Sequence, residues 1–146
     1  ENKIKQGDPY QWQVEHTVNE LVKKLSIKNL NHILSYQSRV GPLKWIGPST
    51  EVIIKEEAKK NKIIVVVPVA FVSEHSETLV ELDIEYKKLA VENGCKDYLR
   101  VPAVTANQDF INSLKSSILK ASSGERFTSS IKCIEKHKKC PRIQNI

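Results

Sequence analysis

The sequence of 146 residues contains no methionine and three cysteines. A primary translation product begins with methionine, so we expect the N-terminus of this chain to be processed or cut. The three cysteines, Cys95, Cys133 and Cys140, are too few for a disulfide-stabilised scaffold. We therefore expect a reducing compartment and a chain that folds around an ordinary apolar core.

Long hydrophobic runs are also missing. The longest apolar stretch, residues 63–72, is broken by Pro68 and is far shorter than the roughly 20 residues that span a bilayer. Residues 1–9 are polar and show no signal-peptide pattern. We expect neither a transmembrane helix nor a secretory signal in these residues.

Most of the chain lacks an excess of either charge. The net charge of +6 comes almost wholly from residues 120–146, which hold seven Lys or Arg and two Asp or Glu. A neutral body argues against a nucleic-acid-binding surface, so we expect no nucleic acid as a partner. The basic tail is typical of a solvated segment, and a peripheral contact with anionic lipid or with another protein is the alternative.

Apolar spacing and residues typical of helix ends predict alternating helices and strands. Asp8 and Asn107 are expected to cap two of the helices, Ser49 or Thr50 and Ser73 the other two, and Gly94 is expected to stop the third. Helices are predicted at residues 9–25, 50–60, 73–93 and 107–119. Strands are predicted at residues 32–37, 63–69 and 98–101, and the second of these has the continuous apolar character of a strand buried on both faces.

This alternation predicts an α/β fold with a parallel sheet that is covered by helices on both faces. Ligands of such sheets lie beyond the carboxyl ends of the strands, which here are residues 38–50 and 71–77. Because the chain opens with a helix, we expect the strand that would precede it to be missing. The predicted division is a domain at residues 1–121 and a basic, poorly structured tail at residues 122–146.

Three acidic residues, Glu77, Glu81 and Glu85, recur at every fourth position of the third predicted helix. Like charges at this spacing cost a helix roughly 0.2–0.5 kcal/mol per pair. The row is therefore either a solvated face or a path for cations and protons. His75 is expected in the first turn, where the helix dipole keeps it neutral and able to accept a proton or to bind a metal beside Glu77. A preference for acidic residues near a helix start explains the pattern equally well.

Two further features are open on spacing alone. Trp45 lies between two Gly-Pro pairs, where it would either stack on a flat ligand or anchor the loop to the core. Cys133 and Cys140 fit no common zinc spacing, and two thiolates do not complete a four-ligand site. We interpret these two as ordinary cysteines of the tail, and Cys95 as a small filler residue at a helix end.

Several segments resemble motifs of the ferrochelatase family. Residues 37–50, QSRVGPLKWIGPST, resemble its porphyrin-loop motif, and residues 67–86, VPVAFVSEHSETLVELDIEY, resemble its catalytic-helix motif. GDPY at residues 7–10 and RVPA at residues 100–103 match two more family segments in the same order. The resemblance extends over about residues 7–120.

The resemblance implies a role for each matching residue. Glu77 matches the carboxylate at the metal-insertion site, and His75 matches the histidine beside it. Glu81 and Glu85 match an acidic line that would carry protons away or iron in. The residues expected to bind the porphyrin substrate are Trp45, Ser38, Val40 and Pro42.

The implied reaction inserts Fe²⁺, as a substrate, into protoporphyrin IX to give haem, and it needs no organic cofactor. The implied fold is one of two similar Rossmann-like, three-layer α/β/α domains with the active site between them. The family's Ser-x-His-x-x-Pro segment, whose histidine faces the carboxylate across the porphyrin, does not appear before GDPY. We therefore expect the C-terminal half of a ferrochelatase, which needs the N-terminal half as a partner and is inactive alone.

Two other functions are compatible with the same residues: a small homodimeric, single-domain chelatase, and a non-enzymatic module that binds tetrapyrrole or iron. Some family members bind an iron–sulfur cluster through C-terminal cysteines. Cys133 and Cys140 are too few for one, so no cluster is expected, and a remnant of such a site is the alternative for these two residues. Richness in Lys, Asn and Ile suggests an AT-rich genome, and we expect a bacterial cytoplasmic protein, with a peripheral membrane location or a mitochondrial one as alternatives.

Overall fold

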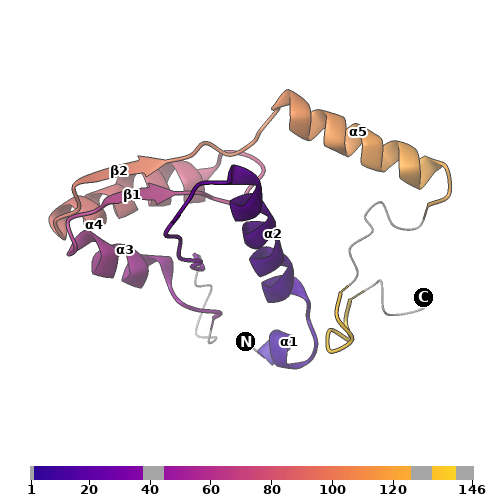
Figure 1. Ribbon diagram of the computed structural model, residues 1–146, viewed down its shortest axis with the longest axis horizontal. Helices are drawn as coiled ribbons and strands as arrows, with labels where there is room; N and C mark the ends of the chain where they lie inside the picture. Colours follow the sequence, from indigo (N-terminus) through magenta and orange to yellow (C-terminus); the bar gives the residue numbers. More distant parts are fainter. Residues whose placement is uncertain (1, 38–44, 126–132, 141–146) are drawn as a thin grey trace. The chain divides into compact units, whose positions relative to one another are not determined.

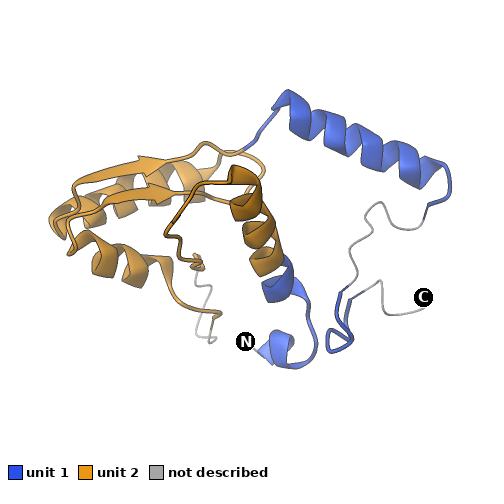
Figure 2. Cartoon of the chain, viewed as in Figure 1, with its two compact units in different colours: residues 1–13, 104–146 blue, residues 14–103 orange. Residues whose placement is uncertain are grey.

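The computed structural model describes residues 2–37, 45–125 and 133–140. These residues form a mixed α/β structure with one small parallel sheet (Figure 1). The elements are α1 Asn2–Lys5, α2 Tyr10–Leu25, α3 Thr50–Ala58, β1 Ile63–Val66, the π-helix η1 Glu77–Tyr86, α4 Lys87–Glu92, β2 Asp97–Arg100 and α5 Gln108–Ser122. They fall into two compact units, one of residues 1–13 and 104–146 and the other of residues 14–103 (Figure 2).

The sheet belongs to the second unit. β1 and β2 pair in parallel, with Ile63 opposite Asp97 and Val66 opposite Arg100. Parallel neighbours need a crossover connection, and here η1 and α4 supply it. The predicted strand at residues 98–101 is confirmed, one residue earlier than expected.

A small apolar core lies between the sheet and two helices. Ile54 of α3, Ala90 of α4 and Tyr98 of β2 are buried together, and Ile64 and Val66 of β1 pack against them. Burying a large aliphatic side chain such as Ile54 stabilises the fold by about 1.5–3 kcal/mol. These contacts hold the carboxyl end of β1, and with it the segment that leads into η1, in a fixed place.

The prediction of a seven-residue strand buried on both faces is wrong for β1. The strand ends at Val66, and burial alternates along it, with Ile63 and Val65 more than half exposed. The helices α3 and α4 pack on the Ile64 and Val66 face, and Pro68 lacks the N–H that would extend the ladder. A third layer of helices stays a prediction.

Residues 32–37 do not form the predicted strand. They contribute a single parallel bridge, between Tyr36 and Ser49. The Tyr36 N–H donates to the Pro48 carbonyl at 2.9 Å, and the Thr50 N–H donates to the Tyr36 carbonyl at 3.2 Å. The segment therefore pairs with the turn before α3, and a lone bridge of this kind does not propagate into a ladder.

The third predicted helix starts later than expected. It begins at Glu77 rather than after Ser73, and its first ten residues are a π-helix with i→i+5 bonds. His75 therefore precedes the first turn. The stop after α4 is confirmed, because Gly94 takes a φ of +88°.

Two of the four predicted caps are confirmed with their hydrogen bonds, the cap at Ser49 is confirmed in position only, and the cap at Ser73 is wrong because η1 begins at Glu77. The Asp8 carboxylate accepts the Tyr10 N–H at 2.9 Å, and the Asn107 side chain accepts the N–H groups of Asp109 and Phe110. Ser49 precedes α3, but its side chain makes no capping bond. No described helix is both long and apolar enough to cross a membrane.

In the first unit, residues 133–140, which we call the tail loop, pack against residues 6–13. Gly7 is buried with a φ of +93°, and its carbonyl accepts the Lys139 N–H at 3.1 Å. A Cβ at position 7 would lie 2.9 Å from the Lys138 nitrogen. A glycine is therefore required both by the backbone angle and by the close approach of the tail loop.

Candidate functional site

His75 lies in the connection between β1 and η1 and is held on two sides. Its ring packs edge-on against the ring of Phe71, with centroids 4.6 Å apart. Its Nδ1 atom accepts the backbone N–H of Glu77 at 3.2 Å. A ring nitrogen that accepts a hydrogen bond carries no proton, so a neutral His75 has its proton on Nε2.

The turn that carries His75 is closed by Thr78, whose side chain is fully buried. The Thr78 hydroxyl donates to the His75 carbonyl at 3.0 Å and accepts the His75 N–H at 2.9 Å. The hydroxyl gives the His75 N–H a partner, and the His75 carbonyl also accepts the N–H groups of Thr78 and Leu79 at 3.0 and 2.8 Å. These bonds fix the direction in which the chain enters η1.

Glu77 is the first residue of η1 and is partly buried. Its N–H is taken by His75, and its carbonyl accepts the side chain of Gln37 at 3.1 Å. The backbone of Glu77 is therefore bonded on both sides. The structure places the His75 ring against the backbone N–H of Glu77, and a shared base or metal role for the two side chains stays a prediction.

Glu81 accepts two hydrogen bonds through its two carboxylate oxygens. Gln37 donates to Oε2 at 2.8 Å, and the Tyr86 hydroxyl donates to Oε1 at 2.9 Å. Burial and the bond to Glu81 raise the pKa of Tyr86 well above its usual value, so Tyr86 stays a donor at neutral pH. Gln37 thus bridges the start of η1 to Glu81, one turn further on.

An open cavity of about 670 Å³ lies beside this bridge. Its lining combines aromatic rings with a few polar groups, which is the usual character of a small-molecule site. The cavity is lined by Tyr36, Gln37, Trp45, Val52, Glu81 and Tyr86, among others. Trp45 is 40% exposed, so its ring is available to a flat ligand in the cavity.

The remaining predicted site residues are Glu85 and three residues of the porphyrin-loop motif. Glu85 is exposed near the end of η1, whereas Glu77 and Glu81 are partly buried. The i→i+5 bonds of a π-helix put slightly more than four residues in each turn, so positions four apart still lie near one side of η1, and it is exposure that separates Glu85 from the other two. The expected substrate-binding residues Ser38, Val40 and Pro42 lie outside the described residues.

A buried cation ties the site to the sheet. The Arg100 guanidinium of β2 donates to Glu74 at 2.6 Å and to both carboxylate oxygens of Asp83. The Ala103 N–H adds a bond of 2.8 Å to Glu74. The Thr78 hydroxyl, Arg100 and this N–H lower the pKa of Glu74 to about 2, and Arg100 lowers the pKa of Asp83. Both carboxylates are therefore charged at neutral pH. Through Arg100 they attach the segment before His75 and the middle of η1 to β2, and we call this arrangement the clamp.

Sequence reasoning missed Gln37, Thr78 and Arg100. All three lie in segments that resemble family motifs: Gln37 begins the porphyrin-loop motif, and Thr78 and Arg100 lie in the other matching segments. The partners of Gln37 and Arg100, however, are polar groups brought close only by the fold, such as Glu81 for Gln37 across 44 positions. Thr78, by contrast, bonds to His75 three positions away. The one available signal was a basic residue, Arg100, near the end of a predicted strand that follows an acidic helix.

The described residues do not assemble a metal centre by themselves. Within residues 2–37, 45–125 and 133–140, no three His, Cys, Asp or Glu side chains come together to hold a metal ion. Cys133 and Cys140 meet each other, but they bring no third and fourth ligand of the kind an iron–sulfur cluster requires. The expectation about cofactors stays a prediction.

Comparisons with known proteins agree on one family. The sequence profile described as Ferrochelatase matches residues 1–122. A ferrochelatase of Pelagibacter ubique (strain HTCC1062) is 60% identical over 145 residues, which are 97% of this chain and 42% of that protein. A ferrochelatase of Rickettsia bellii (strain OSU 85-389) is 48% identical and covers 94% of this chain and 40% of its own length.

A third relative, the ferrochelatase of Rickettsia typhi, is 51% identical over 117 residues, or 80% of this chain. The chain thus spans about two fifths of the length of the curated relatives that it matches most fully. All three relatives come from bacteria. The match of the family profile over most of the sequence establishes that this chain belongs to the ferrochelatase family.

Proposed function

We propose that this chain supplies one side of a metal-insertion site, in which Fe²⁺ enters protoporphyrin IX and haem is formed. In this reaction two pyrrole N–H protons leave as the metal takes their place on the ring nitrogens. The site must therefore present a base and a path for two protons. The observation that carries the proposal is the pair formed by Glu77 and His75, linked through Gln37 to the acidic, aromatic-lined cavity at Glu81.

Glu77 is the residue to which we assign the base and the metal-contacting role. A carboxylate is a hard ligand that suits ferrous iron, and it can accept a pyrrole proton. The backbone of Glu77 is held by His75 and Gln37, which fixes the point from which its side chain extends. Because the backbone of Glu77 is fixed, its carboxylate stays within a short distance of one place, as proton transfer requires.

His75 receives a different role from the one its position alone suggested. Because its Nδ1 accepts the Glu77 N–H, the neutral ring offers a donor rather than a lone pair at Nε2. We therefore assign His75 to orienting Glu77 and to hydrogen-bond donation. Nε2 becomes a proton acceptor or a metal ligand only if Nδ1 releases the Glu77 N–H and takes the ring proton.

Glu81 and the cavity are the proposed exit for protons and the proposed contact with the porphyrin. Glu81 has two donors, Gln37 and Tyr86, which hold its carboxylate at the cavity wall. Trp45, on the cavity wall, would stack on the flat macrocycle. Glu85, exposed further along η1, would be the last acidic residue before solvent.

The finer features of the whole protein are part of the same proposal. We infer that the chain is the C-terminal half of a ferrochelatase, that its domain is a Rossmann-like, three-layer α/β/α domain, and that the other half completes the cleft. The exposed face of β1, with Ile63 and Val65, supports the further layer. The bacterial relatives support a bacterial cytoplasmic protein, with peripheral membrane contact as the alternative.

A chimera tests the proposed reaction. The aligned segment of the Pelagibacter ubique ferrochelatase is replaced by this chain, and iron insertion into protoporphyrin IX is followed by absorbance. Glu77→Gln should lower kcat by at least about 10²-fold, the scale expected for a positioned acid or base. Glu81→Gln should cost less, because water can bypass a relay residue. Glu56→Gln, on the exposed side of α3, is the control and should leave kcat unchanged.

Two results would contradict the proposal or favour its alternatives. If Glu77→Gln in a folded, active chimera keeps the kcat of the parent, Glu77 is not the base. If the 146-residue chain alone inserts iron, it is a chelatase that needs no second half. If porphyrin quenches the tryptophan fluorescence of the chain alone, if Trp45→Phe removes this quenching while Trp12 is kept, and if the chimera has no activity, the non-enzymatic module is favoured.

A further inference from the structure

The sulfur atoms of Cys133 and Cys140 lie 2.7 Å apart. This separation is longer than the S–S bond of a disulfide, about 2.05 Å, but the two sulfur atoms are in direct contact. Cys140 is 1% exposed and Cys133 is partly buried, so the two thiols, which we call the thiol pair, differ in access to solvent. Cys95 belongs to the other compact unit, in the turn after α4.

The tail loop brings the thiol pair together through its own backbone. The His137 N–H donates to the Ile134 carbonyl at 2.9 Å, and the Cys140 N–H donates to the His137 carbonyl at 2.8 Å. These two successive turns fold residues 133–140 back on themselves. The two cysteines therefore meet because of a defined backbone path, seven positions apart in sequence.

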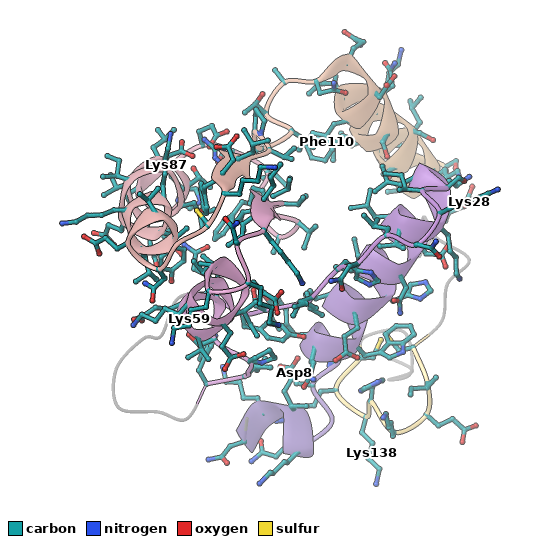
Figure 3. The ribbon with its side chains drawn as sticks, turned by 60° about the vertical axis from the view of Figure 1, so that its left-hand side comes forward. Asp8, Lys28, Lys59, Lys87, Phe110 and Lys138 are labelled. Atoms are coloured by element: carbon teal, nitrogen blue, oxygen red, sulfur yellow. The ribbon has the colours of Figure 1, made fainter. Side chains whose placement is uncertain are left out.

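Contacts with the N-terminal segment hold the tail loop in this form. The His137 ring lies against that of Trp12, with centroids 5.6 Å apart, and the Gln13 amide contacts the Cys133 sulfur at 3.9 Å. The Lys139 side chain donates to Gln6 at 2.7 Å. Figure 3 labels Asp8 on the N-terminal segment and Lys138 on the tail loop. The thiol pair is thus presented by the folded unit as well as by its local turn.

We propose that Cys133 and Cys140 form a reversible disulfide by exchange with a low-molecular-weight disulfide such as oxidised glutathione. Cys133, the more accessible thiol, attacks as the thiolate, forms a mixed disulfide and releases one reduced thiol. The Cys140 thiolate then attacks the Cys133 sulfur and releases the second. The protein loses two protons and two electrons, and the electrons reduce the small disulfide to two thiols.

The test equilibrates the purified protein with mixtures of reduced and oxidised glutathione, traps thiols by alkylation and maps the peptides by mass spectrometry. The expected result is a Cys133–Cys140 link, lost again with dithiothreitol, while Cys95 stays alkylated. Cys140→Ser should stop the exchange at a Cys133–glutathione adduct. Cys133→Ser should leave the buried Cys140 unmodified, and Cys95→Ser should change nothing.

The contribution of the fold is measured by repeating the titration in urea. Because folding holds the two sulfurs together, the equilibrium constant for ring closure should fall by about tenfold or more on unfolding, as expected when an effective concentration is lost. An equal constant in folded and unfolded protein would overturn the inference. So would two alkylated tail cysteines in excess oxidised glutathione, a link from either of them to Cys95, or a stable glutathione adduct in the unsubstituted protein.

Discussion

Arg100 shows how a single side chain joins parts of the site that are far apart in sequence. Its guanidinium reaches Glu74, just before His75, and Asp83, in the middle of η1. Only 9% of the Arg100 side chain is exposed, and the two acidic groups raise its pKa further, so the cation is permanent. Removing either acidic partner would leave a buried charge only partly compensated, which is usually more damaging than the pair is stabilising.

Glu74→Gln should lower the melting temperature at neutral pH, and the loss should depend on pH. The folded-state pKa of Glu74 is about 2, against an ordinary value of 4.5. A lowered pKa means that the charged carboxylate stabilises the fold fully above about pH 4.5 and progressively less as the pH falls towards 2. The difference in melting temperature between the two proteins should therefore be largest near neutral pH and shrink across this window.

The control for this measurement is Glu56→Gln, which removes the same charge from an exposed position of α3. Its melting temperature should follow that of the parent at every pH. A constant gap between the parent and Glu74→Gln from pH 7 to pH 3 would show that the charge of Glu74 is not what stabilises the clamp. In that case the bonds that Glu74 accepts from Arg100 and Ala103 would have to be made equally well by an amide.

At the scale of elements, α5 depends on its cap more than on packing. No residue of this helix, Gln108–Ser122, is buried in the structure. The Asn107 side chain accepts two of the N–H groups that have no partner within the helix. Because little tertiary burial stabilises α5, loss of the cap should lower the stability of the helix by the full energy of the cap.

Asn107→Ala should destabilise α5 by about 1 kcal/mol, within the usual range of 0.5–2 kcal/mol for such caps. The measurement is helix content by circular dichroism through a thermal scan. Asn107→Asp keeps an oxygen acceptor and should retain the parent stability, whereas Ser116→Ala, in the exposed interior of α5, should be neutral or slightly stabilising. Equal melting of the Ala and Asp variants would show that the cap does not matter.

The sequence predicted most elements but not their packing. Caps such as Asp8 and Asn107 act within a few residues, so local spacing reveals them. The π-helical start at Glu77 was missed because an i→i+5 pattern has no simple signature in apolar spacing. The clamp at Arg100 and the Gln37 bridge were missed for a different reason: each joins polar groups whose proximity only the tertiary fold creates. Family resemblance supplied the proposed roles of Glu77 and Trp45, which spacing left undecided.

At the scale of the whole molecule, large exposed apolar side chains should determine whether the chain stays monomeric. In α5, Ile118 is 65% and Leu119 is 59% exposed, and Ile111 and Leu114 are more than 40% exposed. A contiguous apolar stripe of this kind is uncommon on a stable monomer. The 146-residue chain, taken alone, should therefore self-associate at micromolar concentration.

Replacing Ile118 by lysine should reduce this association and raise the monomer fraction, as measured by light scattering or analytical ultracentrifugation. Ser113→Lys adds the same charge at an exposed polar position of α5 and serves as the control. If both variants reduce association equally, net charge is the cause. If neither does, α5 does not mediate the contact.

The π-helical form of η1 makes the number of residues in this segment as important as their identity. Tyr98 donates to the Leu82 carbonyl at 2.8 Å and Arg100 holds Asp83, so β2 fixes one side of η1 while Thr78 fixes its start. A π-helix differs from an α-helix by the extra residue in each turn. Deleting one residue between Thr78 and Leu82 would let the segment relax towards an α-helix and turn Glu77 and Glu81 away from Gln37. Natural variation in this stretch should consequently run through substitutions, with insertions and deletions confined to the connections on either side.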